Sequence, residues 1–514
     1  FGDTTQATVT AANLFNFAVS TSFSFSINNF LSPPTEQASD AIKITSYISG
    51  SQIDTCSAYV SGLSPKPISG VTITSSTGAT IVVNKQYLLR FTFTLTDTLS
   101  QTDTITINFP SSTQLSFSTS TVSSNFSVFP SNATYDSTTL NLLLYMQNQG
   151  RTFASGSVLI LTIGTYTAPP SIETTPAFTL SIYRNGFIKM QGTATLTASS
   201  SVLSGNVSMT TTSVNANTSY VFTITTLDAL SSAGKIKIIL PSAVSILTSS
   251  AACASVSGTG MAISPVCSFN SIENSITLSS INSSSSIING EIIIITINGL
   301  KNPSSTAPTS SFSVFTYYKS TDSSLVATGS LSGVTATTAL IDSSKVTVIP
   351  SSYVVNDQST IYSLQLNVVN PIPAGGFFLI SIPPEITVSV SSIVGLCSIN
   401  INSTSFIPTV CTSALTTVVV VNFTNPFTAD MPAGSSFIAK ISNVFTNPSS
   451  TRPTSSFGLD TFHSNGYYIA NIFASISVQM NTADSFQLNT VTRSSSKNYD
   501  IATYTFTIKQ KSAL

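Results

Sequence analysis

The sequence predicts an all-β protein of tandem immunoglobulin-like β-sandwich domains. A ten-residue phrase, NPSSTAPTSS at 302–311, returns with one change as NPSSTRPTSS at 447–456, and more divergent copies begin near Ser32 and Pro169. The strand after each copy ends in an aromatic residue, and these aromatics are spaced by about 136, 134 and 145 residues: Tyr47, Tyr183, Tyr317 and Phe462. Within each repeat, short alternating segments without an amphipathic helical pattern predict about seven strands.

The first element of each repeat is a strand that alternates apolar and polar residues, which indicates one buried and one solvated face. We align four such strands by their apolar residues: Phe91, Phe93 and Leu95; Tyr220, Phe222 and Ile224; Tyr362, Leu364 and Leu366; Tyr504, Phe506 and Ile508. The next strand ends at a proline, which cannot donate to a sheet ladder: Pro110, Pro241 and Pro383.

The repeated phrase joins an apolar strand to the strand that ends in the aromatic residue. Its two prolines favour extended or turn geometry and oppose helix, so we expect a crossover from one sheet to the other. A ligand loop shared by the repeats is the alternative interpretation. After the aromatic, tight hairpin turns are predicted at Ser49–Gly50, Asn185–Gly186 and Asn465–Gly466.

These elements predict three whole sandwich domains at 71–203, 204–343 and 344–481. Residues 1–70 would form the back half of a sandwich, and 482–514 the first strands of another. Because an incomplete sheet exposes edges and apolar faces, such segments can pair with strands from outside. The predicted assembly strands carry Tyr504, Phe506 and Ile508 in the tail and Phe23, Phe25 and Ile27 in the head.

Donation of the tail to the next protomer would be a head-to-tail contact that does not close, and would give a homopolymeric filament. The alternative is that the chain is part of a longer, continuous repeat array. Both versions predict that the chain's main partner is itself.

Composition restricts the other partners. Only 7% of residues are charged, 41% are hydrophobic and the net charge is −1, so a basic surface for nucleic acid or anionic lipid is not expected. The apolar runs are too short for a membrane-spanning helix. We expect an extracellular or cell-surface protein carrying covalent glycans. Sequons permit N-glycosylation, although a Ser/Thr-rich chain contains sequons by chance: Asn125, Asn132, Asn206, Asn217, Asn282, Asn402 and Asn422.

Four of the five cysteines form two pairs with equal spacing at corresponding places in their repeats, Cys253 with Cys267 and Cys397 with Cys411. Each disulfide would stabilise the fold by about 3 kcal/mol in the chain-entropy model, and the pair implies an oxidising compartment. Four buried free thiols are the alternative. Cys56 has no partner in this pattern and is predicted to be free or intermolecular.

The sequence does not predict an enzyme. A nucleophilic triad needs an imidazole, and the single histidine, His463, lies beside a predicted turn. Neither clustered His and Cys nor closely spaced acids suggest a zinc or calcium site, and we expect no cofactor. Two distant acids that converge in one cleft, as in glycoside hydrolases, are the remaining enzymatic alternative.

The segments NPSSTAPTSSFSVFTYY and NPSSTRPTSSFGLDTFHSNGYYIA resemble repeat modules of very large, Ser/Thr-rich secreted or surface proteins of ciliated protists. The resemblance covers most of the chain and implies an extracellular glycoprotein of repeated β domains, without catalytic residues. Our leading hypothesis is a structural subunit of an extracellular filament or fibril. The alternative is a cell-surface adhesin or binding module whose loops contact a partner such as surface carbohydrate.

Overall fold

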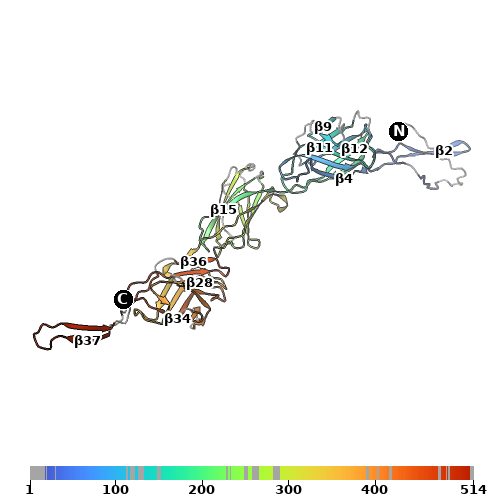
Figure 1. Ribbon diagram of the computed structural model, residues 1–514. Coiled ribbons are helices and arrows are strands. Elements are labelled where there is room, and N and C mark those ends of the chain that lie inside the picture. The colour runs from blue at the N-terminus through green and yellow to red at the C-terminus, as the bar shows by residue number, and fades with distance from the viewer. Residues whose placement is uncertain are drawn as a thin grey trace. The chain divides into compact units, whose positions relative to one another are not determined.

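The computed structural model describes residues 18–509 with several gaps (Figure 1). The gaps are 19, 23, 29–30, 112–113, 116–121, 126–131, 147–151, 227, 229, 232, 248–252, 258–265, 282–289, 389–392, 402–404, 416–418, 473–475, 482 and 484–486. Regular structure in the described part is β-strand, apart from two short 3-10 helices, η2 (Asp322–Ser324) and η3 (Ser343–Lys345).

The chain divides into two compact units. The first comprises Phe1–Gly78, Leu88–Tyr166 and Pro176–Leu196, and the second comprises Ala79–Tyr87, Thr167–Thr175 and Thr197–Leu514.

The first β-sandwich has a six-stranded and a five-stranded sheet. The six-stranded sheet has the order β3 (Lys66–Pro67), β13 (Phe187–Ala194), β12 (Phe178–Arg184), β6 (Thr104–Asn108), β10 (Asn141–Tyr145) and β9 (Asn132–Asp136). The other has the order β4 (Ser69–Ser75), β5 (Gln86–Thr94), β11 (Val158–Thr167) and β7 (Gln114–Leu115), with β8 (Ser123–Ser124) also pairing with β11.

The second sandwich repeats this arrangement. Its six-stranded sheet has the order β14 (Ser201–Val202), β24 (Leu325–Leu331), β23 (Phe312–Tyr317), β17 (Lys235–Ile239), β21 (Ser275–Ser279) and β20 (Val266–Asn270). The five-stranded sheet has the order β15 (Ser204–Met209), β16 (Asn217–Thr225), β22 (Ile292–Lys301) and β18 (Ser245–Ile246), with β19 (Cys253–Ser257) also pairing with β22.

The third sandwich follows the same plan. One sheet has the order β25 (Ala339–Leu340), β36 (Tyr468–Ile472), β35 (Gly458–Phe462), β28 (Phe377–Ile382), β33 (Val419–Phe423) and β32 (Cys411–Leu415). The other has the order β26 (Val346–Pro350), β27 (Thr360–Asn367), β34 (Ser436–Thr446), β30 (Cys397–Ile401) and β31 (Ile407–Pro408), with β29 (Thr387–Val388) also pairing with β34.

The repeated strand order confirms the predicted all-β fold of tandem sandwiches. The prediction of seven strands per repeat was too low, because strands of two residues carry no periodic signal. The boundaries at 71, 204 and 344 were also a few residues late. The short strands β3, β14 and β25 precede them and pair in parallel with the last hairpin strand of the sandwich that follows.

The repeated phrase is a crossover between sheets, as predicted. We define four copies of this crossover phrase as residues 32–41, 168–177, 302–311 and 447–456. The last three connect β11 to β12, β22 to β23 and β34 to β35, and each of these connections changes sheet. The strands closed by Pro110, Pro241 and Pro383 are β6, β17 and β28, each of which ends one or two residues before its proline.

Each crossover phrase precedes an antiparallel pair that we call the aromatic hairpin: β1–β2 (Ile42–Ile48 and Ser51–Ala58), β12–β13, β23–β24 and β35–β36. Ser49–Gly50 and Asn185–Gly186 have φ values of 48° and 84°, and 53° and 83°, which confirms two tight turns of the predicted kind. The turn at Asn465–Gly466 is wider, because the hairpin closes with His463 N–H donating to Tyr467 O.

The sandwich cores consist of the apolar faces of the alternating strands. In β16, Tyr220, Phe222 and Ile224 are fully buried. Phe222 packs edge-on against Phe312 of β23, with ring centroids 5.5 Å apart, and so joins the two sheets of the second sandwich. Burial of each such side chain stabilises the fold by about 2 kcal/mol.

The structure corrects our alignment of the first repeat. Ala168 N–H donates to Lys85 O, and Asn302 N–H donates to Ala216 O in the second repeat. Leu89 of β5 lies four residues after Lys85, and Tyr220 of β16 lies four residues after Ala216, so Leu89 occupies the position of Tyr220. The cross-strand pairing of β5 with β4 and of β16 with β15 gives the same alignment. The aromatic Phe91 therefore corresponds to Phe222, two residues further along. The alternation alone could not detect this shift, because a shift of two preserves period two.

Two hairpins, β1–β2 and β37–β38 (Gln487–Arg493 and Tyr504–Lys509), each form a two-stranded sheet outside the sandwiches. The predicted head strand around Phe25 and Ile27 is not a strand in the structure, and Phe23 lies outside the described residues. Its counterpart β11 pairs with β5, and the described residues before β1 contain no strand that could take the place of β5. Alternating side chains do not form a strand without a ladder partner.

Candidate interaction surfaces

The hairpin β37–β38 exposes residues that a sandwich buries. Tyr504, Phe506 and Ile508 are 55%, 61% and 52% exposed. Their counterparts in β16 are Tyr220, Phe222 and Ile224, because Arg493 faces Tyr504 in the ladder as Met209 faces Tyr220. Those counterparts are fully buried. β37–β38 therefore has the sequence of the first strand pair of a sandwich but not its burial.

The hairpin β1–β2 is exposed in the same way. Tyr47 is 63% exposed, whereas its counterparts Tyr317 and Phe462 are 7% and 5% exposed. Ile42 and Ile44 are 49% and 42% exposed. Their counterparts in the three whole sandwiches are almost fully buried: Phe178, Leu180, Phe312, Val314, Phe457 and Leu459. An apolar hairpin of two strands is marginally stable in water, so both hairpins have faces that burial would stabilise.

The two hairpins correspond to complementary parts of one sandwich. β37–β38 matches β15–β16, which belong to the five-stranded sheet, and β1–β2 matches β23–β24, which belong to the six-stranded sheet. In the whole sandwiches these two strand pairs face each other through contacts such as Phe222 with Phe312. In sequence, the two hairpins therefore correspond to opposite core faces of one sandwich.

A backbone hydrogen bond between a crossover phrase and the aromatic hairpin of the following repeat occurs three times. Glu36 N–H donates to Ile188 O at 2.9 Å, Ile172 N–H to Leu325 O at 2.9 Å, and Thr306 N–H to Tyr468 O at 2.8 Å. Each bond lies within one compact unit. In every case the acceptor is the ladder partner of the hairpin's aromatic residue: Tyr183, Tyr317 or Phe462.

The hydroxyl residue before each of these donors is buried: Thr35, Ser171 and Ser305 are 9%, 4% and 4% exposed. In the fourth phrase the equivalent Ser450 and Thr451 are exposed. The local conformation is nevertheless the same, because Arg452 N–H donates to Ser450 Oγ at 3.4 Å, as Ala307 N–H donates to Ser305 Oγ. The fourth phrase therefore has the same local turn as the others, but its residues at these positions are exposed to solvent.

The asparagine that opens the phrase is a buried hydrogen-bond hub, which our sequence analysis did not foresee. Asn302 accepts from Tyr220 Oη at 3.0 Å and donates to Thr211 O and Ser213 O. Asn447 accepts from Tyr362 Oη and donates to Ser352 O and Val354 O. Burial raises the pKa of both tyrosines above its ordinary value, so they are donors at neutral pH.

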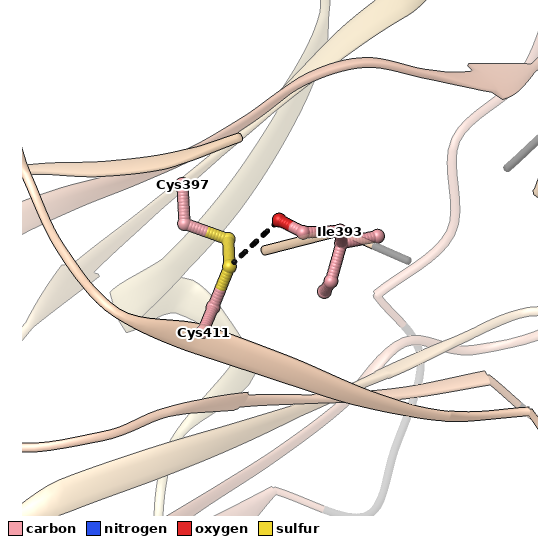
Figure 2. Close-up of a disulfide and its surroundings, with 3 residues drawn as sticks. All are labelled: Ile393, Cys397 and Cys411. Carbon is pink, nitrogen blue, oxygen red and sulfur yellow. Dashed lines mark hydrogen bonds between the residues drawn. A yellow bond between two sulfur atoms is a disulfide. The ribbon is translucent and has the colours of Figure 1, made fainter. Parts of the chain in front are cut away.

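The predicted disulfide between Cys397 and Cys411 is present (Figure 2). It connects β30 in one sheet of the third sandwich to β32 in the other, with Cα atoms 6.1 Å apart, and Cys411 Sγ lies 3.4 Å from Ile393 O. Both sulfurs are buried, so the bond is an internal link between the sheets.

In the second sandwich, Cys267 is also disulfide-bonded. The side chain of its predicted partner, Cys253, lies outside the described residues, but strand β19 of Cys253 and strand β20 of Cys267 belong to opposite sheets, as β30 and β32 do. Cys56 is a free, exposed cysteine on β2.

The predicted glycosylation sites have different surroundings. Asn132, Asn206 and Asn217 are exposed, whereas Asn282 and Asn402 lie outside the described residues. Asn125 is exposed, but its Nδ2, the atom that would carry a glycan, donates to Val158 O at 3.1 Å. Asn422 is half-buried in β33, between β28 and β32, and its Oδ1 is buried. These surroundings favour the first three sites.

The most buried charges form one cluster in the first sandwich. Asp103, whose side chain is fully buried, accepts from Arg184 Nε at 2.7 Å and Arg184 Nη2 at 2.9 Å, and it lies 3.7 Å from Lys189 Nζ. Lys189 also donates to Thr98 O. Burial lowers the pKa of Lys189, while Asp103 opposes this shift. Complete pairing of this kind is typical of a structural ionic network.

No other chemistry is apparent in the described part of the chain. Within it, no group of three or more His, Cys, Asp or Glu residues could hold a metal ion. His463 lies in the β35–β36 turn, where its Nδ1 is 3.3 Å from Ser464 Oγ. A search of the described residues finds no helix long and apolar enough to cross a membrane. The non-enzymatic role remains a prediction.

No known protein family and no curated protein matches the sequence, so the resemblance to protist surface modules stays a prediction. Several solved structures are similar. The C-terminal domain of the Streptococcus pyogenes antigen I/II-family protein AspA has 10% identity and a TM-score of 0.20, and the match covers 53% of this chain and 100% of that one.

A putative membrane anchored protein from Corynebacterium diphtheriae has 11% identity and a TM-score of 0.18, covering 86% of this chain and 98% of that one. The N-terminal domain of the Streptococcus gordonii adhesin Sgo0707 has 8% identity and a TM-score of 0.21, covering 78% and 88%. Because these scores and identities are low, the fold assignment depends on the strand order of this chain, and the similarities carry no information about function.

Proposed function

We propose that this chain is a structural subunit of an extracellular filament or fibril, in which β37–β38 of one repeat array completes the sandwich to which β1–β2 of the next belongs. The observation that carries the proposal is the contrast in burial between the two hairpins and their counterparts. Tyr504, Phe506 and Ile508 are more than half exposed, whereas the same positions of β16 are fully buried.

Pairing of the hairpins would remove both apolar faces from water. Each large side chain buried in this way contributes about 2 kcal/mol, and main-chain hydrogen bonds at the strand edges add register. The contact joins different surfaces, so it is heterologous and generates an open filament. The same pairing inside a longer polypeptide would give an equivalent array with a covalent join.

An extracellular location fits the buried Cys397–Cys411 disulfide, since disulfides persist in oxidising compartments. Covalent glycans on Asn132, Asn206 and Asn217 would add polar surface to a chain in which only 7% of residues are charged. We propose no cofactor and no nucleic-acid partner.

Truncation tests the proposal. Removal of residues 484–514 deletes β37–β38 and leaves all three sandwiches with their own cores. We expect the full chain to form filaments with a regular axial repeat in negative-stain microscopy and the truncated chain to remain as single folded particles. Normal filaments from the truncated chain would contradict the proposal.

An adhesin is the second candidate, favoured by one observation. Tyr467 and Tyr468 are adjacent at the β35–β36 turn and are 44% and 43% exposed. Exposed aromatic rings at a loop can stack on sugar rings of a surface carbohydrate. Binding of the truncated chain to a glycan array, lost on replacement of both tyrosines by serine, would favour this function over the filament.

A further inference from the structure

We propose that the fourth crossover phrase is a docking site for an aromatic hairpin and that its occupant is β1–β2 of a second copy of this chain. The bond assigned is from Thr451 N–H of one copy to Gln52 O of the other. This inference rests on the proposed head-to-tail assembly, and it adds a contact that the pairing of β37–β38 does not include.

The donor side follows from the other three phrases. Glu36, Ile172 and Thr306 each donate a backbone N–H to the aromatic hairpin of the following repeat. Thr451 is at the same position, one residue after the hydroxyl residue that caps the local turn. Because Ser450 already accepts from Arg452 N–H, the turn is preformed, and docking would not require the phrase to reorganise.

The acceptor side follows from the hairpin register. A β-bulge precedes the aromatic residue in all four hairpins, and the acceptors Ile188, Leu325 and Tyr468 are the ladder partners of that aromatic. In β1–β2 the bulge lies between Ser46 and Tyr47, and the partner of Tyr47 is Gln52. Gln52 is exposed along with the whole of strand β2.

The choice of occupant follows from what is uncovered. Each of the hairpins β12–β13, β23–β24 and β35–β36 already meets a phrase, and each of the first three phrases already meets a hairpin. Among the described residues, the fourth phrase is the one phrase without a hydrogen bond to the aromatic hairpin of another repeat, and β1–β2 is the one aromatic hairpin without a hydrogen bond from the phrase of another repeat. A single copy of this chain therefore presents one docking site and one matching hairpin, which is the stoichiometry of a head-to-tail contact between copies.

Disulfide trapping between two single-cysteine variants tests the contact. Residues joined by a backbone hydrogen bond across neighbouring strands have Cα atoms about 5 Å apart, within the range of a disulfide. In a Cys56→Ser background, Thr451→Cys and Gln52→Cys chains are mixed and oxidised mildly. We expect a mixed disulfide that links the two variants, at least tenfold more abundant than the product of the control mixture.

The control replaces Thr451→Cys by Thr306→Cys, which changes the same residue type at the corresponding position of the third phrase. Its site is occupied by Tyr468 of the same chain, so no link to Gln52→Cys is expected. Folding of every variant is checked by mass spectrometry of the intact Cys397–Cys411 disulfide.

Sedimentation of the unmodified chain separates the two proposals. If chains assemble but Thr451→Cys links to Gln52→Cys no better than Thr306→Cys does, the docking contact is wrong and the filament proposal stands. If chains remain monomeric and no link forms, both are wrong. A following repeat of a longer polypeptide as the true occupant would also give no link between copies, and would overturn the inference.

Discussion

The hydroxyl of Tyr362 donates to Oδ1 of Asn447 at 2.8 Å inside the third sandwich. This bond connects the first residue of the fourth crossover phrase to β27, a strand whose apolar face is part of the core. The second sandwich repeats it between Tyr220 and Asn302. The first has neither partner, because Leu89 and Ala168 stand at the two positions. Because both side chains of the pair are apolar there, neither a tyrosine hydroxyl nor an asparagine amide is left buried without the other.

Replacement of Asn447 by alanine should destabilise the third sandwich by about 3 kcal/mol, because it removes the partner of Tyr362 Oη and of two buried carbonyls. Tyr362→Phe should cost about 1 kcal/mol, since it removes one bond. Denaturant unfolding measures both values. Equal effects of the two variants would show that Asn447 does not act as a hub.

Reduction of Cys397–Cys411 should lower the stability of the third sandwich by about 3 kcal/mol, since the bond closes a loop with a sequence separation of 14. The double variant Cys397→Ser and Cys411→Ser should reproduce this loss without reductant. Unfolding curves with and without dithiothreitol give the comparison. The double variant should not respond to dithiothreitol in its third sandwich; a response there would assign the effect to another disulfide.

Asp103→Ala should destabilise the first sandwich by about 3–5 kcal/mol, because Arg184 and the buried Lys189 lose their shared counter-charge. The matched control is Lys66→Ala, which breaks the more exposed pair with Asp97 and should cost about 0–1 kcal/mol. Thermal unfolding of both variants distinguishes a buried network from a surface one. Similar losses would contradict the structural role of the cluster.

Asp460→Asn should stabilise the third sandwich at neutral pH. Burial raises the pKa of Asp460 above its unfolded value, so the ionised form destabilises the fold as pH rises through the acidic range. The stability difference between variant and parent should therefore be near zero below the ordinary aspartate pKa and grow above it. Asp342→Asn is the opposite control, because hydrogen bonds from Ser344 lower the pKa of Asp342. Unfolding free energies measured across pH 3–7 test both signs.

The fold was largely predictable because its evidence is local. Period two in strands such as β16, prolines that end β6, β17 and β28, and the copied phrase all belong to short segments. Strand order and the shift at Leu89 were not predictable, since they depend on hydrogen bonds between segments distant in sequence. The segment around Phe25 shows the same limit, because it has the strand pattern but is not a strand in the structure.

The candidate surfaces were predictable in part. Exposure of Tyr504, Phe506 and Ile508 was predicted from the repeat, because residues 482–514 carry the pattern of only the first strands of a sandwich. The hub role of Asn302 and Asn447 was missed, although the sequence held a signal: tyrosine and asparagine occur together in two repeats. The contact of Thr306 with Tyr468 had no signal, since backbone hydrogen bonds do not depend on side-chain identity.

The proposed assembly buries one face of β38 between chains. Phe506 lies on that face and Thr507 on the opposite one, because alternate strand residues point to opposite sides. Both are exposed in a single chain, so Phe506→Asp and Thr507→Asp should leave the three sandwiches equally stable.

Sedimentation velocity of these two variants beside the parent chain is the most direct measurement. We expect large assemblies of the parent and of Thr507→Asp, and monomers of Phe506→Asp. If Phe506→Asp assembled over the same concentration range as the parent, or if both variants lost assembly equally, burial of this face of β38 between chains would be contradicted.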